Sequence, residues 1–521
     1  MLVRRPLVAL AATAATVTLL VMGFSKLYAQ SSPASSLQVN FQPSSSTVPA
    51  GYTEDTGAAY TNERGSGWVS QDSLSDTTAT PLDVTPNSRD RNRSGIDPRL
   101  NTLIHMQFPD STFNESAVRI PAAWELALPD GAYSVHVGVG DQPSDNGVYD
   151  SQHSLNVEGV GAIDRFEPST AREYAQALVR ADITDGKLTV DAIGGTNTKI
   201  NFLQIASYPG FPAVTWGNAA ASPIARSEAQ GGFANGKLYV ISGYIDSTYK
   251  PTKRSDVYNP ASNSWARVAD LPVATTHAGT AIVGKDIYLA GGYAAKSNGS
   301  QAFSSKNVWK YDTAANSWTA LPALPVARGS GALVELGGEL HFFGGADSNR
   351  LDKGEHWFLR LNGGTSWTSV APIPDPRSHM GYASLGGKIY AIGGQHGIDA
   401  NLVTQASVYV WDPATGAWSQ VASLPTGRSH ISSTTFVMDN RIVVLGGEIA
   451  HTKPVPDVTA YDPLTNGWTA LTPLPAKRHS GVGGGFGDRL YYTTGGLSIK
   501  TTYRGTPGYN TSAALTPSKR M

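Results

Sequence analysis

Five arginines recur at matching positions between residues 226 and 478. Each lies three residues after a proline in one of six segments that are about fifty residues long, and they are Arg226, Arg328, Arg377, Arg428 and Arg478. The remaining segment has Thr275 at this position. A guanidinium donates paired hydrogen bonds to carboxylates and phosphates, so arginines that converge on one place would bind an anion or another polar ligand.

A second set of polar residues stands two positions after each of these sites. Its members are Glu228, His277, Ser330, His379, His430 and Ser480. Three histidines and a carboxylate would bind a metal ion if the fold brought them together, or would act as acid and base on a substrate. The same side chains also bridge neighbouring loops by hydrogen bonds. Spacing alone leaves these alternatives open.

Both sets belong to a repeat that organises the chain from residue 213 onward. Six tryptophans are each followed by a proline seven residues later, and they are Trp216, Trp265, Trp318, Trp367, Trp418 and Trp468. Their spacings are 49, 53, 49, 51 and 50 residues. Each segment also has an apolar strand that ends in Gly-Gly or a near equivalent, from Ser242-Gly243 to Thr494-Gly495. In four segments an aromatic residue followed by Asp or Asn precedes the tryptophan, whereas one segment has Arg360-Leu361 there.

This order of glycine pair, aromatic-Asp, Trp, Pro and Arg resembles the kelch repeat, whose period is about fifty residues. The resemblance covers residues 213–507 and implies a β-propeller in which each repeat is one four-stranded blade. No further Trp follows Thr494-Gly495, whereas Trp216 precedes the first complete glycine-bearing strand. We therefore predict that the segment from Val214 to Asn218 closes a six-bladed ring as the outer strand of the last blade, which leaves no open sheet edge. The alternative is five blades with frayed ends.

The resemblance also bears on the two polar sets. It places the Pro-x-x-Arg positions on the loop that enters the innermost strand of each blade, so the arginines are expected to converge around one mouth of the central channel. Kelch domains that bind acidic peptides use arginines at similar places. Arginine and histidine at these positions are ordinary in kelch repeats, where they bridge loops. We therefore predict a ligand-binding mouth formed by the arginines, Glu228 and the three histidines, with no metal, cofactor or catalytic residue.

Residues 38–206 have a strand-like pattern without a repeat. Tyr133, Val135, Val137 and Val139 alternate with smaller or polar residues, which is the period of a strand. Asp130-Gly131 and Asp185-Gly186 predict hairpin turns. One helix is expected around 169–179, and the remainder predicts a β-sandwich. The predicted fold is therefore all-β, a sandwich followed by a propeller.

Several motifs in this segment are similar to those of malectin-like, galactose-binding-like carbohydrate modules. They include VNFQP (39–43), GYTEDTGAAY (51–60), Gly67-Trp68 and TNTKINFLQI (196–205). The resemblance implies glycan binding by aromatic and polar side chains on loops at one end of the sandwich. The candidates are Tyr52, Asp55, Tyr60, Trp68 and Arg99. In the alternative interpretation, Tyr60 and Trp68 are core residues and Asp55 shapes a turn.

The N-terminus has the pattern of an export signal. Arg4 and Arg5 precede an uncharged run over 7–24, and a small-residue stretch begins at Ala29. We predict a signal peptide over 1–29, with an uncleaved membrane anchor as the alternative, a Ser-rich tether over 30–37 and a flexible tail over 508–521. The protein is therefore expected outside the cell, at its surface or in a periplasm.

Composition excludes several classes of function. The 40 Lys and Arg nearly balance the 41 Asp and Glu, so the chain has no basic footprint for nucleic acid. There is no cysteine, which excludes disulfides, thiolate metal sites and lipid-modified cysteine anchors. Copper-radical oxidases share the propeller, but they need a Cys–Tyr cross-link that this chain cannot form.

These observations favour an exported, non-catalytic binding protein. The sandwich is expected to bind a glycan, and the propeller a protein, peptide or polar ligand. The alternative is a sugar mutarotase or epimerase, because exported six-bladed kelch proteins include sialic-acid mutarotases. Such an enzyme would use the Arg, His and Glu residues of the channel mouth on an anionic sugar.

Overall fold

The structure is a computed structural model that describes residues 36–109, 116–142, 147–298 and 300–509. The predicted signal peptide lies outside the described residues, as do most of the predicted tether and tail. The described residues form strands and short 3-10 helices, with no α-helix among them. None of the helices in these ranges is long and apolar enough to cross a membrane.

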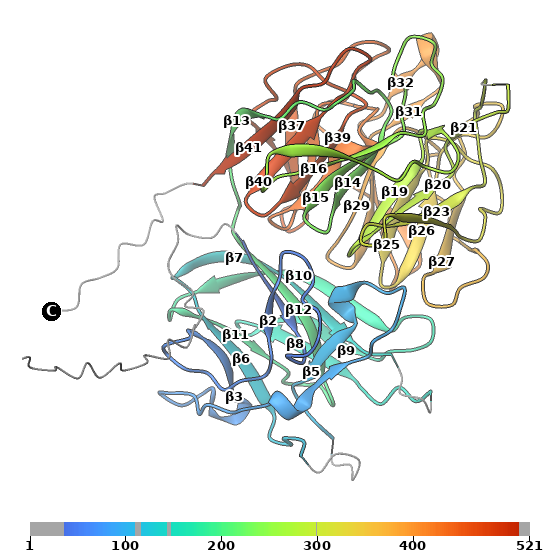
Figure 1. The fold of residues 1–521 in the computed structure, drawn as a ribbon. Coiled ribbons are helices and arrows are strands. Elements are labelled where there is room, and N and C mark those ends of the chain that lie inside the picture. Colours follow the sequence, from blue (N-terminus) through green and yellow to red (C-terminus); the bar gives the residue numbers. More distant parts are fainter. Residues whose placement is uncertain (1–35, 110–115, 143–146, 299, 510–521) are drawn as a thin grey trace, which may run out of the picture.

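The strands between Ser36 and Ser207 form two sheets that pack face to face (Figure 1). The first sheet has the order β10 (Tyr174–Ile183), β7 (Gly131–Gly140), β12 (Lys199–Ser207), β1 (Ser36–Phe41) and β2 (Thr53–Asp55), with β5 (Thr102–His105) also paired to β12 and β4 (Ser88–Asp90) to β5. The second has the order β3 (Ser66–Ser70), β6 (Ala122–Ala127), β11 (Lys187–Asp191), β8 (His153–Val157) and β9 (Val160–Phe166). The connections contain η1 (Gln71–Ser73), η2 (Thr85–Asn87) and η3 (Pro98–Leu100).

The core of this sandwich lies between the two sheets. The predicted alternation in β7 is observed, because Val135, Val137 and Val139 are fully buried in this core. Phe41 packs edge-on against the indoles of Trp68 and Trp124, with ring centroids 5.6 Å apart in both pairs. Burial of such large aromatic side chains supplies much of the stability of a small sandwich.

Two local predictions for this region are wrong. The segment expected to be helical lies largely in β10, which pairs with β7 along ten residues, from Tyr174 opposite Gly140 to Ile183 opposite Gly131. A ladder of that length outweighs a local helical preference. The turns at Asp130-Gly131 and Asp185-Gly186 each carry the chain from one sheet to the other, so neither joins two paired strands.

The remaining strands form six four-stranded sheets, which we number as blades I to VI. Blade I contains β14 (Gln230–Ala234), β15 (Lys237–Ile241), β16 (Ser255–Asn259) and β17 (Ser264–Val268). Blade II contains β19 (Gly279–Val283), β20 (Asp286–Ala290), β23 (Val308–Asp312) and β24 (Ser317–Ala320). Blade III contains β25 (Ala332–Leu336), β26 (Glu339–Phe343), β27 (His356–Arg360) and β28 (Thr368–Val370).

Blades IV and V have the same plan, and the loops carry additional short elements. Blade IV contains β29 (Gly381–Leu385), β30 (Lys388–Ile392), β33 (Val408–Asp412) and β34 (Ala417–Val421), and blade V contains β35 (Thr435–Met438), β36 (Arg441–Leu445), β37 (Val458–Asp462) and β38 (Gly467–Leu471). The additional elements are β18 (Thr275–Thr276), β21 (Tyr293–Ala295), β22 (Gln301–Ala302), β31 (Gln395–His396), β32 (Val403–Thr404), η4 (Asp399–Asn401) and η5 (Ser432–Thr434).

Blade VI closes the ring as the repeat predicts. It contains β39 (Val482–Phe486), β40 (Arg489–Thr493), β41 (Thr502–Gly508) and, as its outer strand, β13 (Ala213–Ala219). β13 pairs with β41 from Ala213 opposite Gly508 to Ala219 opposite Thr502, and the two strands lie side by side in Figure 1. The alternative of five blades with frayed ends is therefore wrong.

The repeat tryptophans join each blade to the one before it. Trp265 of blade I donates its indole N–H to Ala220 O beyond β13 at 2.8 Å, and Trp318 of blade II donates to Ala269 O at 3.1 Å. The same bond is made by Trp367, Trp418, Trp468 and Trp216. All six tryptophans therefore form a continuous set of inter-blade hydrogen bonds, which explains why they recur at one position of the repeat.

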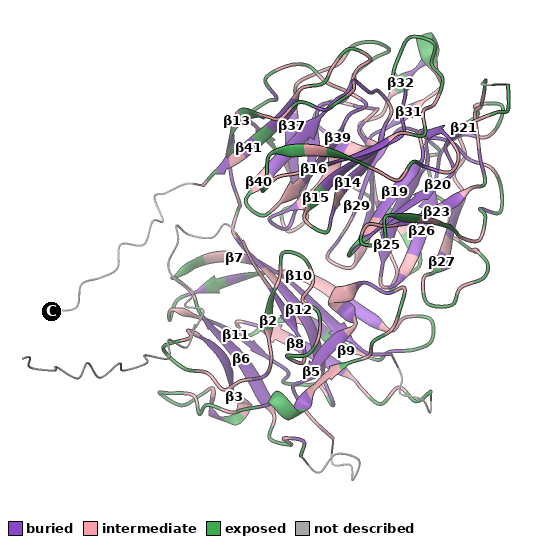
Figure 2. Cartoon of the chain, viewed as in Figure 1, coloured by how far each residue is buried: buried purple, intermediate pink, exposed green. Residues whose placement is uncertain are grey.

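The sandwich packs against the turns between the first and second strands of the blades (Figure 1). Asn440 donates to Ser134 O at 3.0 Å and to Gln204 O at 3.1 Å. The backbone of Gly387, at φ +74°, is so near the sandwich that a Cβ there would lie 2.5 Å from Gln176 O. Residues along the blade strands are mostly buried, whereas many residues of the outer loops are exposed (Figure 2).

Candidate functional site

Glu228, His277, Ser330, His379, His430 and Ser480 surround the propeller axis, and we call them the axial ring. All six have positive φ between +53° and +57°. Backbone N–H groups of the ring donate to carbonyls of the preceding blade's member, as in His379 N to Ser330 O (3.0 Å) and Glu228 N to Ser480 O (3.0 Å). Positive φ is unfavourable for residues with a Cβ. These hydrogen bonds compensate for it and hold all six side chains at the channel mouth.

Glu228 is the hub of the axial ring. Its carboxylate accepts a short hydrogen bond from Ser480 Oγ. His277 Nε2 lies 3.5 Å from Glu228 Oε2, and His430 Nε2 lies 3.6 Å from Oε1. His379 Nε2 is 3.3 Å from Ser330 Oγ. The pocket among these residues has a volume of about 20 Å³, which is room for about one water molecule. The axial ring therefore nearly closes this end of the channel.

The carboxylates act differently on the histidines of the axial ring. Burial by itself lowers the pKa of His430, but Glu228 and Glu448, whose Oε1 is 3.0 Å from His430 Nδ1, outweigh burial and the pKa is raised. Burial raises the pKa of Glu228, but His277 and His430 reverse this and the pKa is lowered. Burial lowers the pKa of His277 to about 4 and that of His379 well below its usual range. Glu228 and Glu448 thus favour the protonated form of His430, whereas His277 and His379 are neutral at neutral pH.

We expect the neutral histidines to make the fold sensitive to acid. The lowered pKa of His277 means that the unfolded chain binds its proton first as the pH falls. Neutral His277 therefore contributes to the free energy of unfolding above about pH 6.5. This contribution, about 2–3 kcal/mol, is lost as the pH falls towards 4. His277→Gln should remove that part of the loss, measured as the free energy of unfolding in urea at several pH values. His451→Gln, on an exposed loop, is the control; equal pH dependence in both variants and the parent would contradict the assignment.

The structure places the five repeat arginines inside the blades instead of around the channel mouth. Four of them are almost completely buried. Arg377 donates from Nη1 to Gly393 O and Ser407 O, both at 3.0 Å, and Arg428 makes the same pair of bonds to Gly446 O and Asp457 O. Arg226 pairs with Asp256, Arg328 with Glu355, and Arg478 donates to Tyr503 OH at 3.0 Å.

The arginine bonds have a structural role that the repeat also explains. Arg377 and Arg428 each donate to the carbonyl of the first glycine in the Gly-Gly pair that follows the second strand. This bond explains why the arginine and the Gly-Gly pair occur in the same repeats. The guanidinium joins the end of the second strand to the residue before the third. The predicted convergence of arginines on the mouth is therefore not what the structure shows. Only the axial ring converges there.

Trp68 is a core residue of the sandwich, and Asp55 is hydrogen-bonded to it. Trp68 is fully buried, and its indole N–H donates to Asp55 Oδ1 at 2.8 Å. The other oxygen of Asp55 accepts the indole N–H of Trp124, also at 2.8 Å. Asp55 Oδ1 additionally accepts the N–H of Gly57 at 2.9 Å. The structure thus agrees with the alternative interpretation: Trp68 is buried, and both oxygens of Asp55 are engaged in hydrogen bonds within the sandwich.

The three other candidates lie in two places. Tyr60 is half-buried beneath Lys187, whose Nζ is 4.6 Å from the ring centroid. Tyr52 and Arg99 both line a large cavity between the sandwich and the propeller. Gln204 donates to Tyr52 OH at 2.6 Å, and Arg99 forms an ion pair with Asp97. Of the five predicted residues, the structure therefore brings only Tyr52 and Arg99 to this cavity, while Trp68 and Asp55 contact each other elsewhere in the sandwich.

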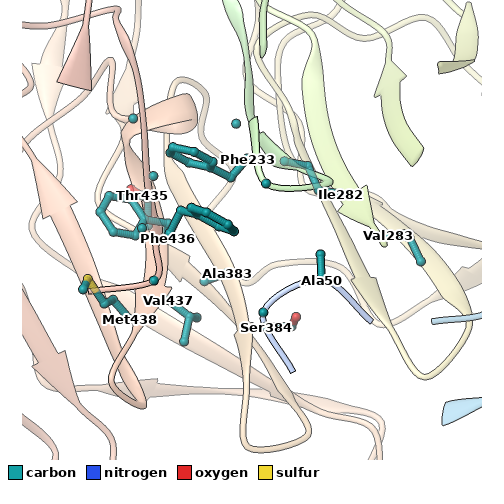
Figure 3. Close-up of a pocket in the computed structure, with 18 of the residues that line it drawn as sticks. Ala50, Phe233, Ile282, Val283, Ala383, Ser384, Thr435, Phe436, Val437 and Met438 are labelled. Carbon is teal, nitrogen blue, oxygen red and sulfur yellow. The ribbon is translucent and has the colours of Figure 1, made fainter. Parts of the chain in front are cut away.

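This cavity, which we call the interdomain cavity, has a volume of about 960 Å³. It occupies the channel end nearest the sandwich, opposite the axial ring (Figure 3). Residues from the innermost strand of every blade line it, together with sandwich residues of 49–52 and 97–99. The sequence predicts Tyr52 and Arg99 as candidates but none of the blade residues of this lining, because the cavity exists only where two domains meet.

The loops on the opposite side of the propeller expose apolar side chains. Tyr249, Leu351 and Val403 are 56%, 58% and 62% exposed. Ile245 and Ile449 are exposed too, and all five lie between the second and third strands of their blades, on the side away from the sandwich (Figure 1). We call this surface the loop face.

Hydrogen bonds join the loop face from blade to blade. Tyr244 OH donates to Gln301 Oε1 at 2.7 Å between blades I and II. Arg350 Nη1 donates to Asp399 Oδ2 at 2.9 Å between blades III and IV. Thr404 Oγ1 donates to Ile449 O at 3.0 Å between blades IV and V. The exposed apolar side chains are therefore carried by loops that support one another.

Within the described residues, no group of three or more His, Cys, Asp or Glu side chains is arranged to hold a metal ion. The axial ring instead satisfies its polar atoms with one another.

Comparison with known proteins identifies the repeat. Residues 276–496 match the family described as the KLHDC2/KLHL20/DRC7 kelch-repeats domain. A kelch repeat-containing protein of Arabidopsis thaliana is 26% identical over 328 residues, covering 58% of this chain and 75% of that protein. Kelch-like protein 23 of Homo sapiens is 27% identical over 269 residues, covering 51% of this chain and 45% of its own length. The chain thus spans less than half of the human relative.

Among solved structures, that of YjhT is 19% identical, with a TM-score of 0.43, over 49% of this chain and 87% of YjhT. The prediction of kelch repeats is confirmed for the residues that match the family. The malectin-like character of the sandwich stays a prediction.

Proposed function

We propose that this protein, whose propeller contains a kelch-repeat domain, is an exported, non-catalytic binding protein that holds a protein or peptide partner on the loop face. The observation that carries the proposal is the set of large apolar side chains exposed there. Single exposed apolar residues are ordinary, but several on one face are typical of an interaction surface. Kelch-like relatives support a protein partner. Export rests on the N-terminal pattern of the sequence.

The inter-blade hydrogen bonds favour this use of the loop face. Loops that are already held in place lose little conformational entropy when a partner binds. The affinity is higher because this cost is small. Apolar anchors on such a frame are suited to a partner with complementary pockets or apolar side chains.

Substitution of two anchors tests the proposal. Leu351→Ser combined with Val403→Ser should weaken partner binding about tenfold or more, because each change removes an exposed apolar contact. Stability should change little, since both side chains are in solvent. The measurement is quantitative mass spectrometry of proteins retained from the extracellular fraction of the source organism, followed by titration of any partner retained.

Ile193→Ser provides the matched control, because Ile193 is an equally exposed apolar residue on the sandwich. A partner that is retained by the control and lost by the double variant supports the loop face. A partner that binds the double variant as tightly as the parent protein would place the contact elsewhere.

The second half of the proposal is carbohydrate binding that involves the sandwich. It is supported by the resemblance of residues 38–206 to malectin-like modules and by the position of Tyr52 and Arg99 at the interdomain cavity. Titration of the intact protein with neutral and acidic saccharides tests it, and the absence of binding to all of them overturns it.

The geometry gives no support to a sugar mutarotase at the channel mouth. The pocket at the axial ring has room for about one water molecule, so a pyranose does not fit beside Glu228 and the histidines. The repeat arginines that would bind an anionic sugar are engaged inside their blades.

A further inference from the structure

The interdomain cavity has the size and position of a ligand site. Its volume of about 960 Å³ lies at the upper end of the range for small-molecule sites, and such sites occur preferentially between domains. The exposed turn residues Asn235, Gly487 and Asp488 belong to its lining, so the cavity reaches solvent beside blades I and VI. The axial ring nearly closes the far end of the channel.

The walls of the cavity present apolar surface that the protein leaves partly uncovered. Phe233, Ile282, Phe436 and Val437 are all half-buried and line it. Figure 3 shows Phe233 and Phe436 among the residues that line the cavity, with Ala50 of the sandwich projecting towards the same space. The ring of Phe233 is fixed by parallel stacking on Phe486, with centroids 5.4 Å apart. The ring of Phe233 is therefore supported by a second aromatic ring.

Polar groups of both domains border the same space. Arg99 and Asp97 come from the sandwich, whereas Glu335 and Ser384 come from blades III and IV. Glu335 Oε1 accepts the N–H of Gly338 at 2.8 Å. A ligand in the cavity would therefore meet a guanidinium donor, carboxyl groups and a hydroxyl within one enclosure.

The charge of this lining is nearly balanced. The guanidinium of Arg99 is neutralised by Asp97 through their ion pair. Burial, reinforced by Asp97, raises the pKa of Glu335 to about 8, so this carboxyl group is largely protonated at neutral pH. Asp439, whose pKa burial raises to about 6, accepts a hydrogen bond from Tyr509 at 2.7 Å. Arg489, the other arginine of the lining, pairs with Asp488. An anionic ligand would therefore lose its hydration here without gaining an unpaired cation.

We propose that the interdomain cavity binds a neutral saccharide, held jointly by the sandwich and the propeller. A pyranose has an apolar C–H face for Phe436 or Phe233 and hydroxyl groups for Arg99, Asp97 and Glu335. This inference rests on the carbohydrate half of the proposed function. It assigns the site to the junction of the domains and includes residues of the kelch propeller.

Filling the cavity tests the inference on the intact protein. Ala50 is exposed to the cavity, so Ala50→Trp adds a bulky side chain there without disturbing a core. Isothermal titration with neutral mono- and disaccharides should give binding that Ala50→Trp weakens by about tenfold or more. Ala261→Trp, on an exposed blade I turn outside the cavity lining, should change binding less than about twofold.

The saccharide panel separates failure of the site from failure of the function. Binding of a neutral saccharide that Ala50→Trp leaves unchanged overturns the cavity assignment but keeps carbohydrate binding. Binding that is restricted to uronic acids, or to compounds with acyl chains, overturns the assignment of a neutral saccharide as the ligand. No binding by any saccharide overturns both. Phe436→Ala gives a second readout, with weaker binding expected in a protein that remains folded. Some loss of stability is also expected, because Phe436 is half-buried and packs against core residues of blades V and VI.

Discussion

Replacing Asp55 with alanine is expected to lower the free energy of unfolding of the sandwich by about 3–5 kcal/mol. Asp55 accepts the indole N–H groups of Trp68 and Trp124, both at 2.8 Å, and both indoles are buried. Without the carboxylate, two donors remain in the core with no acceptor. Each unpaired buried donor costs about 1–3 kcal/mol, and the lost bond to Gly57 adds to this.

Equilibrium unfolding in urea, followed by tryptophan fluorescence, measures this change. Asp55→Asn keeps one carbonyl acceptor and should lose less stability than the alanine variant. Glu54→Ala is the control for a neighbouring exposed carboxylate and should change stability by less than about 0.5 kcal/mol. A loss in Asp55→Ala no larger than that of Glu54→Ala would show that the two indoles do not depend on this residue.

Replacing Arg226 with methionine is expected to destabilise blade I by about 3–5 kcal/mol, because it removes the fully buried one of the two cations that contact the buried carboxylate of Asp256. Arg226 is fully buried and pairs with Asp256, which is itself 1% exposed. Its Nη1 also donates to Val240 O at 2.7 Å and to Arg254 O at 3.0 Å. The substitution therefore removes one charge of a buried pair and leaves backbone acceptors unpaired.

Arg254→Met is the matched control for this prediction. Arg254 contacts the same carboxylate, with Nε 2.9 Å from Asp256 Oδ2, but its side chain is 30% exposed. Water replaces an exposed cation more readily, so the control should lose about 1 kcal/mol or less. Thermal unfolding of both variants separates the two cases, and equal losses would mean that burial of Arg226 does not matter. The double variant Arg226→Met with Asp256→Leu should recover part of the lost stability.

The sequence was sufficient for the architecture of the propeller because the repeat records contacts that every blade must make. Trp216 and its counterparts recur because each donates its indole N–H to the preceding blade. The ring closure followed from counting the ends of the repeat. The region now in β10 was misjudged because its ladder with β7 depends on a partner strand that local sequence does not identify.

The candidate site was less predictable, because spacing locates a residue but not the direction of its side chain. Arg377 lies on the same loop as His379 of the axial ring, two residues before it. Its guanidinium nevertheless bonds to Gly393 and Ser407 within the blade. His379 instead faces the axis. Likewise, Asp55 accepts the indole N–H of Trp68, and the spacing of these two candidates in the sequence does not indicate this bond. The interdomain cavity depends on how two domains pack and leaves no pattern in either.

The strand that closes the ring has a consequence for synthesis. β13 emerges from the ribosome at residues 213–219, but its partner β41 ends at residue 508, about 290 residues later. At a translation rate of about 5–20 residues per second, β13 stays unpaired for roughly 15–60 s before β41 has been synthesised. The sandwich, complete by Ser207, has time to fold first. During that interval β13 is an unpaired edge next to a finished domain, so it is the segment where a chaperone would bind and where a truncated chain would aggregate.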